Sequence, residues 1–185
     1  MKKKYFLTLD TETATLPFAN EIAKTAKEKQ NIAIAKPLVY DIGWVISDRK
    51  GNVIKEENFL VKETFFVPSV FNTAYDKDKR PIYMEMLENG EISVKCWDEI
   101  VEILLTDLRQ CYLAASCNAT FEFKKAIPFT ERYIRNLYSD HYNEWEEQQR
   151  EICKRIVRGK GSGKSETFLD PVFILRDEEF PIADL

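Results

Sequence analysis

The clearest hydrophobic pattern in the chain runs from Trp97 to Leu108 and has the period of an α-helix. Its apolar residues recur at spacings of three and four, at Trp97, Ile100, Val101, Leu104, Leu105 and Leu108. Such a stripe covers one face of a helix and predicts that this face is buried in a core. We therefore assign these residues to packing and not to a ligand site.

Other stretches have the composition of β-strands. Residues 5–9 form an apolar run that predicts a short buried strand of about 5–6 residues. Residues 37–47 and 53–61 are rich in strand formers and flank a turn cluster at 48–52, which predicts a hairpin. With the first strand, this hairpin makes a three-stranded antiparallel meander. Residues 111–116 read as a further buried strand, which we expect to be parallel.

Weaker patterns predict the remaining helices. Residues 20–30 are rich in lysine and helix formers and predict an exposed helix with Asn20 as its N-cap. Residues 65–75 and 81–89 predict two short helices, and helical pieces continue through residues 133–157. The order of three strands, a helix, a strand and a helix predicts an α/β domain with a mixed sheet and flanking helices.

Length and composition indicate one globular domain spanning residues 1–185. The chain has 185 residues and is 44% hydrophobic. No apolar run approaches the roughly 18 residues that span a bilayer, so no membrane partner is expected. The stretch between the basic start and Asp10 is too short for a signal-peptide core. We expect a cytoplasmic protein.

Charge and cysteine content exclude few functions. The four cysteines lack C-x-x-C spacing and the chain has one histidine, His141, so a structural zinc site is not expected. The net charge of −4 argues against broad electrostatic binding to nucleic acid. It leaves room for a local basic groove or for contact with phosphates through a metal.

The first predicted strand ends in two carboxylates, Asp10 and Glu12, with one residue between them. Side chains alternate along a strand, so both point to the same side. Carboxylates this close repel each other, and either one takes up a proton or both share a cation. Hard ions such as Mg²⁺ and Mn²⁺ prefer such oxygen ligands. The alternative is that Asp-Thr-Glu-Thr is a polar turn that caps the strand.

The order of motifs along the chain resembles that of one enzyme family. A strand ending in D-x-E-T precedes the hairpin, and a Trp-Asp-Glu helix precedes an apolar strand that runs into Asn118-Ala-x-Phe-Glu122. This arrangement resembles the DEDD (DnaQ-like) 3′-to-5′ exonuclease family, which has a ribonuclease H-like fold. The resemblance covers roughly residues 4–125 and resumes at 168–171.

The resemblance implies a site and a chemistry. It implies that Asp10, Glu12 and Glu122 are catalytic and hold two Mg²⁺ or Mn²⁺ ions for phosphodiester hydrolysis. Two such ions about 3.5–4 Å apart can activate a water and stabilise the leaving oxygen. It further implies substrate contacts at Thr11, Thr13, Asn118 and Phe121. The partners it implies are a nucleic-acid 3′ end, with single-stranded DNA favoured, and a polymerase or replication protein.

Two features depart from the family pattern. Glu122 stands where the family has aspartate, one methylene shorter. The third motif, H-x-A-x-x-D or Y-x-x-x-D, is not found after Asp170, so we expect the domain to be incomplete at its C-terminus. His141 begins a faint copy of the motif in the wrong order, and residues 180–184 match only its spacing.

Residues 124–167 form a longer connection than the family pattern requires and are interpreted as a helical insertion. Within it, residues 158–165 resemble a phosphate-binding P-loop, but the first glycine is one position too late. We interpret this stretch as a glycine-serine-lysine loop.

Three hypotheses follow. The chain is a metal-dependent exonuclease, or a catalytically degenerate member of the family that binds nucleic acid or a protein partner, or a structural domain with neither metal nor nucleic acid.

Overall fold

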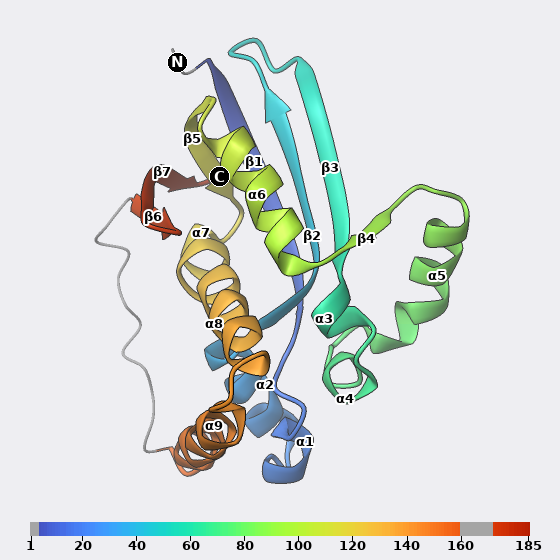
Figure 1. Ribbon diagram of the computed structural model, residues 1–185, viewed down its shortest axis with the longest axis vertical. Coiled ribbons are helices and arrows are strands. Elements are labelled where there is room, and N and C mark those ends of the chain that lie inside the picture. The colour runs from blue at the N-terminus through green and yellow to red at the C-terminus, as the bar shows by residue number, and fades with distance from the viewer. Residues whose placement is uncertain (1–3, 160–171) are drawn as a thin grey trace.

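A computed structural model describes residues 4–159 and 172–185, which form a seven-stranded mixed sheet with flanking helices (Figure 1). The strands are β1 (Tyr5–Ala14), β2 (Leu38–Ser47), β3 (Val53–Val61), β4 (Ser93–Lys95), β5 (Cys111–Ser116), β6 (Val172–Leu175) and β7 (Glu178–Asp184). Their order across the sheet is β4-β3-β2-β1-β5-β7-β6. Strands β1, β2 and β3 form an antiparallel meander, β5 pairs parallel to β1, and β7 pairs parallel to β5. The predicted α/β class and meander are confirmed.

Strand β1 is longer than the sequence predicted. It continues to Ala14, and its residues 6–14 pair with β2, with one register shift after Glu12. Asp10 and Glu12 therefore lie inside a paired strand, opposite Gly43 and Asp41. The interpretation of these residues as a polar turn is wrong, because pairing with β2 extends the strand through polar residues that local propensity does not favour.

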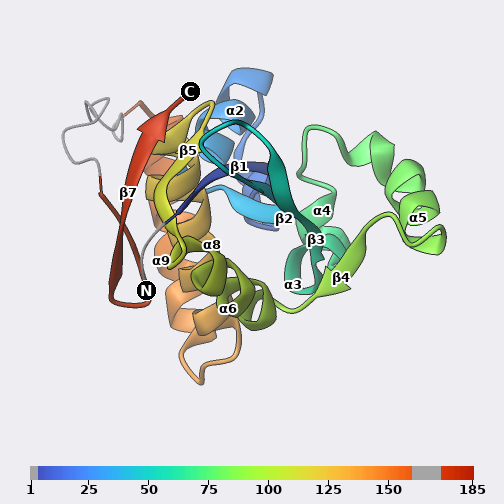
Figure 2. The same ribbon diagram turned by 90° about the horizontal axis from the view of Figure 1, so that it is seen from above.

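The helices of the described residues cover one side of the sheet and its ends. They are α1 (Ala19–Ile22), α2 (Ala26–Ala35), α3 (Lys62–Phe65), α4 (Pro68–Phe71), η1 (Lys77–Lys79), α5 (Arg80–Glu88), α6 (Trp97–Leu108), α7 (Ala119–Phe121), η2 (Glu122–Ala126), α8 (Ile127–Leu137) and α9 (Tyr142–Val157). In Figures 1 and 2, α6 and α8 lie on the same face of the sheet. Within the described ranges, no helix combines the length and apolar character that a bilayer crossing requires.

Two helix predictions need correction. Asn20 is not an N-cap: it lies within the short α1, and the longer helix α2 begins after Thr25. Thr25 accepts from the Glu28 N–H while the Glu28 carboxylate accepts from the Thr25 N–H, a reciprocal capping box. Residues 65–75 do not form one helix, because Pro68 starts a separate helix and disfavours helical backbone in the residue before it.

Helices α7, η2 and α8 follow one another without a break from residue 119 to residue 137. In the π-helical segment η2, the Ile127 N–H donates to the Glu122 carbonyl, five residues back. Pro128 lacks an N–H and cannot donate to residue 124, which favours this wider turn. Such π-turns occur often at functional sites.

One hydrophobic core joins the sheet to α6 and α8 and includes the predicted apolar face of α6. A buried polar contact also attaches α6 to the meander. Asp107 is 1% exposed and accepts from Trp44 Nε1 at 2.9 Å and from Lys55 Nζ at 2.8 Å. Helix α8 is fixed to β2 because the Val39 N–H donates to Thr130 Oγ1 at 2.9 Å.

The hairpin of β6 and β7 was missed by the sequence analysis. Arg176 and Asp177 both have positive φ, as expected for a two-residue hairpin turn with the twist of the flanking strands. Arg176 forms ion pairs with Asp98 and Glu102 of α6 and with Glu131 of α8. These contacts fix β7 beside β5 and bring its last residues to the start of α7.

Candidate functional site

The two faces of β1 differ sharply in exposure. Leu7, Leu9 and Thr11 are buried, whereas Thr8, Asp10 and Glu12 are exposed. This alternation follows from the period of two along a strand, because α6 and α8 cover only one face of the sheet here. Asp10 and Glu12 therefore share the open face of the strand at the centre of the sheet.

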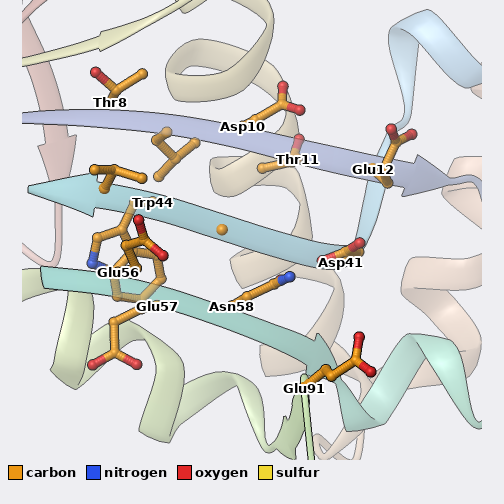
Figure 3. Close-up of a pocket in the computed structure, with 13 residues that line it drawn as sticks. Thr8, Asp10, Thr11, Glu12, Asp41, Trp44, Glu56, Glu57, Asn58 and Glu91 are labelled. Atoms are coloured by element: carbon orange, nitrogen blue, oxygen red, sulfur yellow. The ribbon is translucent and has the colours of Figure 1, made fainter. Parts of the chain in front are cut away.

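A cavity of about 590 Å³ lies on this open face (Figure 3). Gly43 pairs with Asp10 on one side and with Asn58 on the other, so these three residues form a row across β1, β2 and β3. A Cβ at position 43 would lie 3.5 Å from Asn58 Oδ1. The glycine therefore leaves space between the carboxylate of Asp10 and the amide of Asn58.

A third carboxylate, which the sequence analysis did not assign to the site, lies beside Glu12. Asp41 pairs with Glu12 across β1 and β2 and lines the cavity. Its Oδ2 accepts from the hydroxyl of Tyr83 in α5 at 2.9 Å. The pKa of Asp41 is raised to about 6, chiefly by burial and in smaller part by the charges of Glu12 and Asp10, against the Tyr83 hydrogen bond, which lowers it. The register between β1 and β2 places Asp41 beside Glu12, and this register cannot be read from a single sequence.

The environment of Glu12 also favours its protonated form. Desolvation is the largest cause of its raised pKa, followed by the charges of Asp76 and Asp10, and Lys79 opposes them. The open face thus concentrates negative charge that a proton or a cation would relieve. Because the side chains of Asp10 and Glu12 are exposed, an ion or a substrate can reach this negative charge.

Glu122 contacts the same strand from the helical layer. It is 5% exposed, and its Oε2 accepts from the hydroxyl of Thr11, the buried residue between Asp10 and Glu12. Burial raises the pKa of Glu122 to about 7; the Thr11 hydrogen bond lowers it, and the charges of Asp10 and Glu12 raise it. The structure thus brings Glu122 into electrostatic contact with the pair through Thr11.

The remaining predicted residues have local roles in the structure. Asn118 is the N-cap of α7, and its Oδ1 accepts from the Phe121 N–H at 3.1 Å. Phe121 packs against the core, and Thr13 is half-buried opposite Val39. Their predicted contact with substrate stays a prediction.

Asp184 at the end of β7 also meets this region. Its Oδ1 accepts from the Ala119 N–H at 2.8 Å, at the first residue of α7. Residues 180–184 thus belong to a strand, and Phe180 lies in the core.

Other expected features lie elsewhere. His141 immediately precedes α9, and its exposed side chain lies 3.7 Å from Glu144. Nearly all of the stretch that resembles a P-loop, and the resemblance at residues 168–171, fall outside the described residues. Within the described ranges, no group of three or more His, Cys, Asp or Glu side chains is arranged so that it could hold a metal ion.

Comparison of the chain with known protein families, curated proteins and solved structures found no match. A function is therefore inferred from the geometry of the cavity and from the motifs that line it. The geometry brings Asp10, Glu12 and Asp41 to one cavity and places Glu122 behind the same strand.

Proposed function

We propose that the chain is a metal-dependent 3′-to-5′ exonuclease of the DEDD (DnaQ-like) type with a ribonuclease H-like fold. One observation carries the proposal. Asp10 and Glu12 share the open face of the central strand, and Glu122 reaches that strand from the helix that follows the neighbouring parallel strand β5. This is the spatial counterpart of the motif order in the sequence.

The chemical type of the donors suits a hard divalent cation, although the carboxylates of the described residues are not arranged around one point. Asp10 and Glu12 offer carboxylate oxygens to one cavity, and Asp41 and Asn58 add further oxygens to its lining. Mg²⁺ and Mn²⁺ prefer such ligands over nitrogen or sulfur. Burial first, and repulsion between the carboxylates second, raise the pKa values of Glu12 and Asp41, and a cation would relieve the repulsion.

In this proposal Asp10 and Glu12 hold the ions from the open face of β1, and Glu122, which bonds to Thr11 on the covered face, supports the site from behind the strand. When bound, a pair of divalent ions supplies water activation and stabilisation of charge on the leaving oxygen. Thr11 orients Glu122 by its hydrogen bond, and Gly43 keeps the floor of the cavity open. Nucleic-acid 3′ ends are the substrate, with single-stranded DNA favoured.

The test is shortening of a 5′-labelled oligonucleotide in Mg²⁺ or Mn²⁺. The expected result is a ladder of products that lose nucleotides from the 3′ end, absent in Asp10→Ala and Glu12→Ala. Glu179→Ala is the matched control, because Glu179 is an exposed strand carboxylate outside the cavity. Shortening that persists in Asp10→Ala contradicts the proposed site.

A second candidate is a degenerate member of the family that binds nucleic acid or a protein partner without cleavage. The Glu122 side chain favours it, because this carboxylate is buried and bonded to Thr11. A wild-type chain that binds Mn²⁺ through Asp10 but leaves every oligonucleotide intact would support this candidate. Loss of Mn²⁺ binding in Asp10→Asn, measured by calorimetry, shows that Asp10 is a ligand in either case.

A further inference from the structure

Tyr75 is 96% exposed, the most exposed of the large apolar side chains in the described residues. It lies in the segment between α4 and α5, which we call the Tyr75 segment (residues 72–80). A single exposed aromatic residue is ordinary on a protein surface. Tyr75 differs because its backbone is fixed at both ends and lies beside the candidate site.

The first attachment joins the Tyr75 segment to the end of β1. Thr73 Oγ1 accepts from the Thr15 N–H at 2.8 Å and lies 3.0 Å from the Thr15 carbonyl. Thr15 is three residues beyond Glu12, and Ala74 is buried in the core. Tyr75 is therefore held next to the end of the strand that carries the carboxylates.

The second attachment is Arg80 at the other end of the segment. Its guanidinium lies 5.1 Å from the ring centres of both Phe65 and Phe71, and it donates to the Phe65 carbonyl at 3.2 Å. Because the guanidinium of Arg80 makes these contacts, we do not assign it to phosphate binding. The lysines that precede it, Lys77 and Lys79, are exposed.

The Tyr75 segment carries exposed charges of both signs. Lys77, Asp78 and Lys79 are exposed, and Asp76 is half-buried. Lys79 pairs with Asp76 at 3.1 Å, but the ammonium is 57% exposed. Exposed ion pairs of this kind are weak, and a phosphate can displace the aspartate.

An exposed aromatic ring with cationic side chains nearby is a combination that binds unpaired nucleotides, and here Tyr75 is followed by Lys77 and Lys79, which alternate with Asp76 and Asp78. We propose that the Tyr75 segment binds a single-stranded nucleic-acid end, with a base stacked on Tyr75 and phosphates at Lys77 and Lys79. A duplex does not fit, because its bases are already stacked on each other. The inference rests on the proposed function, since it names the substrate that reaches Asp10 and Glu12.

The test is the anisotropy of a short fluorescent oligothymidylate, measured without hydrolysis in EDTA and in Ca²⁺. Tyr75→Ala is expected to weaken binding about tenfold, the loss of one stacked base. Tyr75→Phe keeps the ring and is expected to bind within about twofold of wild type. Tyr138→Ala is the matched control, because Tyr138 is 74% exposed and lies near Glu63 and Asp98, away from the open face.

A second probe separates stacking from general damage to the surface. On a strand whose last 3′ residues are abasic, wild type and Tyr75→Ala are expected to bind equally. Replacing Lys77 and Lys79 by alanine together is expected to reduce the slope of log K against log salt by about 1.4, the value for two phosphates on a single strand.

Three results would overturn the inference: equal binding of oligothymidylate by wild type and Tyr75→Ala, a defect that persists on the abasic strand, or no binding by wild type in either buffer. Hydrolysis in Mg²⁺ or Mn²⁺ is measured separately with Asp10→Ala. Binding that depends on Tyr75 without hydrolysis retains the inference and rejects the enzyme. Hydrolysis together with binding that does not depend on Tyr75 retains the proposed enzyme and rejects the inference about Tyr75.

Discussion

Glu12 of β1 lies directly opposite Asp41 of β2 in the antiparallel pair. Residues opposite each other in such a pair have Cβ atoms about 4.5–5.5 Å apart, so two carboxylates face the same cavity at close range. Only Asp41 has a described hydrogen-bond donor, the hydroxyl of Tyr83. The protein therefore bears an electrostatic cost at this position, which grows as the carboxylates ionise.

Asp41→Asn is expected to stabilise the protein at neutral pH in the absence of divalent ions. The pKa of Asp41 is raised from 3.8 to about 6, so between these values the folded state holds a proton that the unfolded state releases. The free energy of unfolding contributed by Asp41 therefore falls as pH rises through this window. We expect the variant to be about 1–3 kcal/mol more stable than wild type at pH 7.5 and nearly equal at pH 4.

Urea denaturation in EDTA at both pH values measures this difference. The asparagine still accepts from Tyr83, so Asp41→Asn removes charge and keeps the hydrogen bond. Glu179→Gln, at an exposed carboxylate on β7, is the control and should show no such pH dependence. A variant less stable than wild type at pH 7.5 would show that the charge of Asp41 stabilises the fold.

Thr11→Val is expected to destabilise the protein more at pH 8 than at pH 5. It removes the donor to Glu122, whose carboxylate is buried and has a pKa of about 7. A buried acceptor without a partner costs about 1–3 kcal/mol, and more when it is charged. Thermal unfolding of Thr11→Val, with Thr11→Ser to restore the hydroxyl, checks this; equal losses for both variants would assign the effect to packing.

Gly43→Val is expected to lower oligonucleotide hydrolysis or Mn²⁺ binding without unfolding the protein. The new side chain would occupy the space between Asp10 and Asn58, where its Cβ would lie 3.5 Å from Asn58 Oδ1. Oligonucleotide hydrolysis or Mn²⁺ binding should fall by at least about tenfold, while stability changes by about 1 kcal/mol, since glycine weakens strands. Ser47→Val, on the same face of β2 and outside the cavity, should leave both unchanged.

Asp184→Ala is expected to reduce hydrolysis more than stability. Its Oδ1 accepts from the Ala119 N–H, at the start of the helix that carries Glu122 three residues later. Loss of a helix cap costs about 1 kcal/mol, and a small displacement of Glu122 alters the site more than the core. Asp184→Asn keeps the acceptor and should behave as wild type; unchanged hydrolysis in the alanine variant would exclude a positioning role.

The sequence predicted elements well where one local signal dominates. The apolar stripe gave α6 as Trp97–Leu108, and the turn cluster gave the hairpin of β2 and β3. The predictions failed where a neighbouring strand or a cap overrides propensity. Pairing with β2 extended β1 to Ala14, and the Thr25 capping box moved the start of the second helix away from Asn20.

The residues of the candidate site also fall into two groups, those that a local pattern predicts and those that only tertiary contacts bring together. The spacing of Asp10 and Glu12 placed both carboxylates on one face, and the structure confirms this because alternation is a property of any strand. Asp41 and Tyr83 were missed, because they approach Glu12 only through the register of β2 and the packing of α5. Asp184 was considered only for the motif spacing of residues 180–184, and its contact with Ala119 was not predicted because the β6–β7 hairpin, with its apolar run and Arg-Asp turn, was not recognised.

By itself, the sequence determined the periodic elements, the α/β class and the pair of carboxylates on one strand face. These depend on neighbours along the chain, whose geometry is set by backbone dihedrals. The tertiary structure alone decided which face of β1 is open, that Asp41 joins Glu12, that Thr11 holds Glu122, and that Tyr75 lies beside the site. These relationships depend on strand register and helix packing, which bring together residues far apart in the chain.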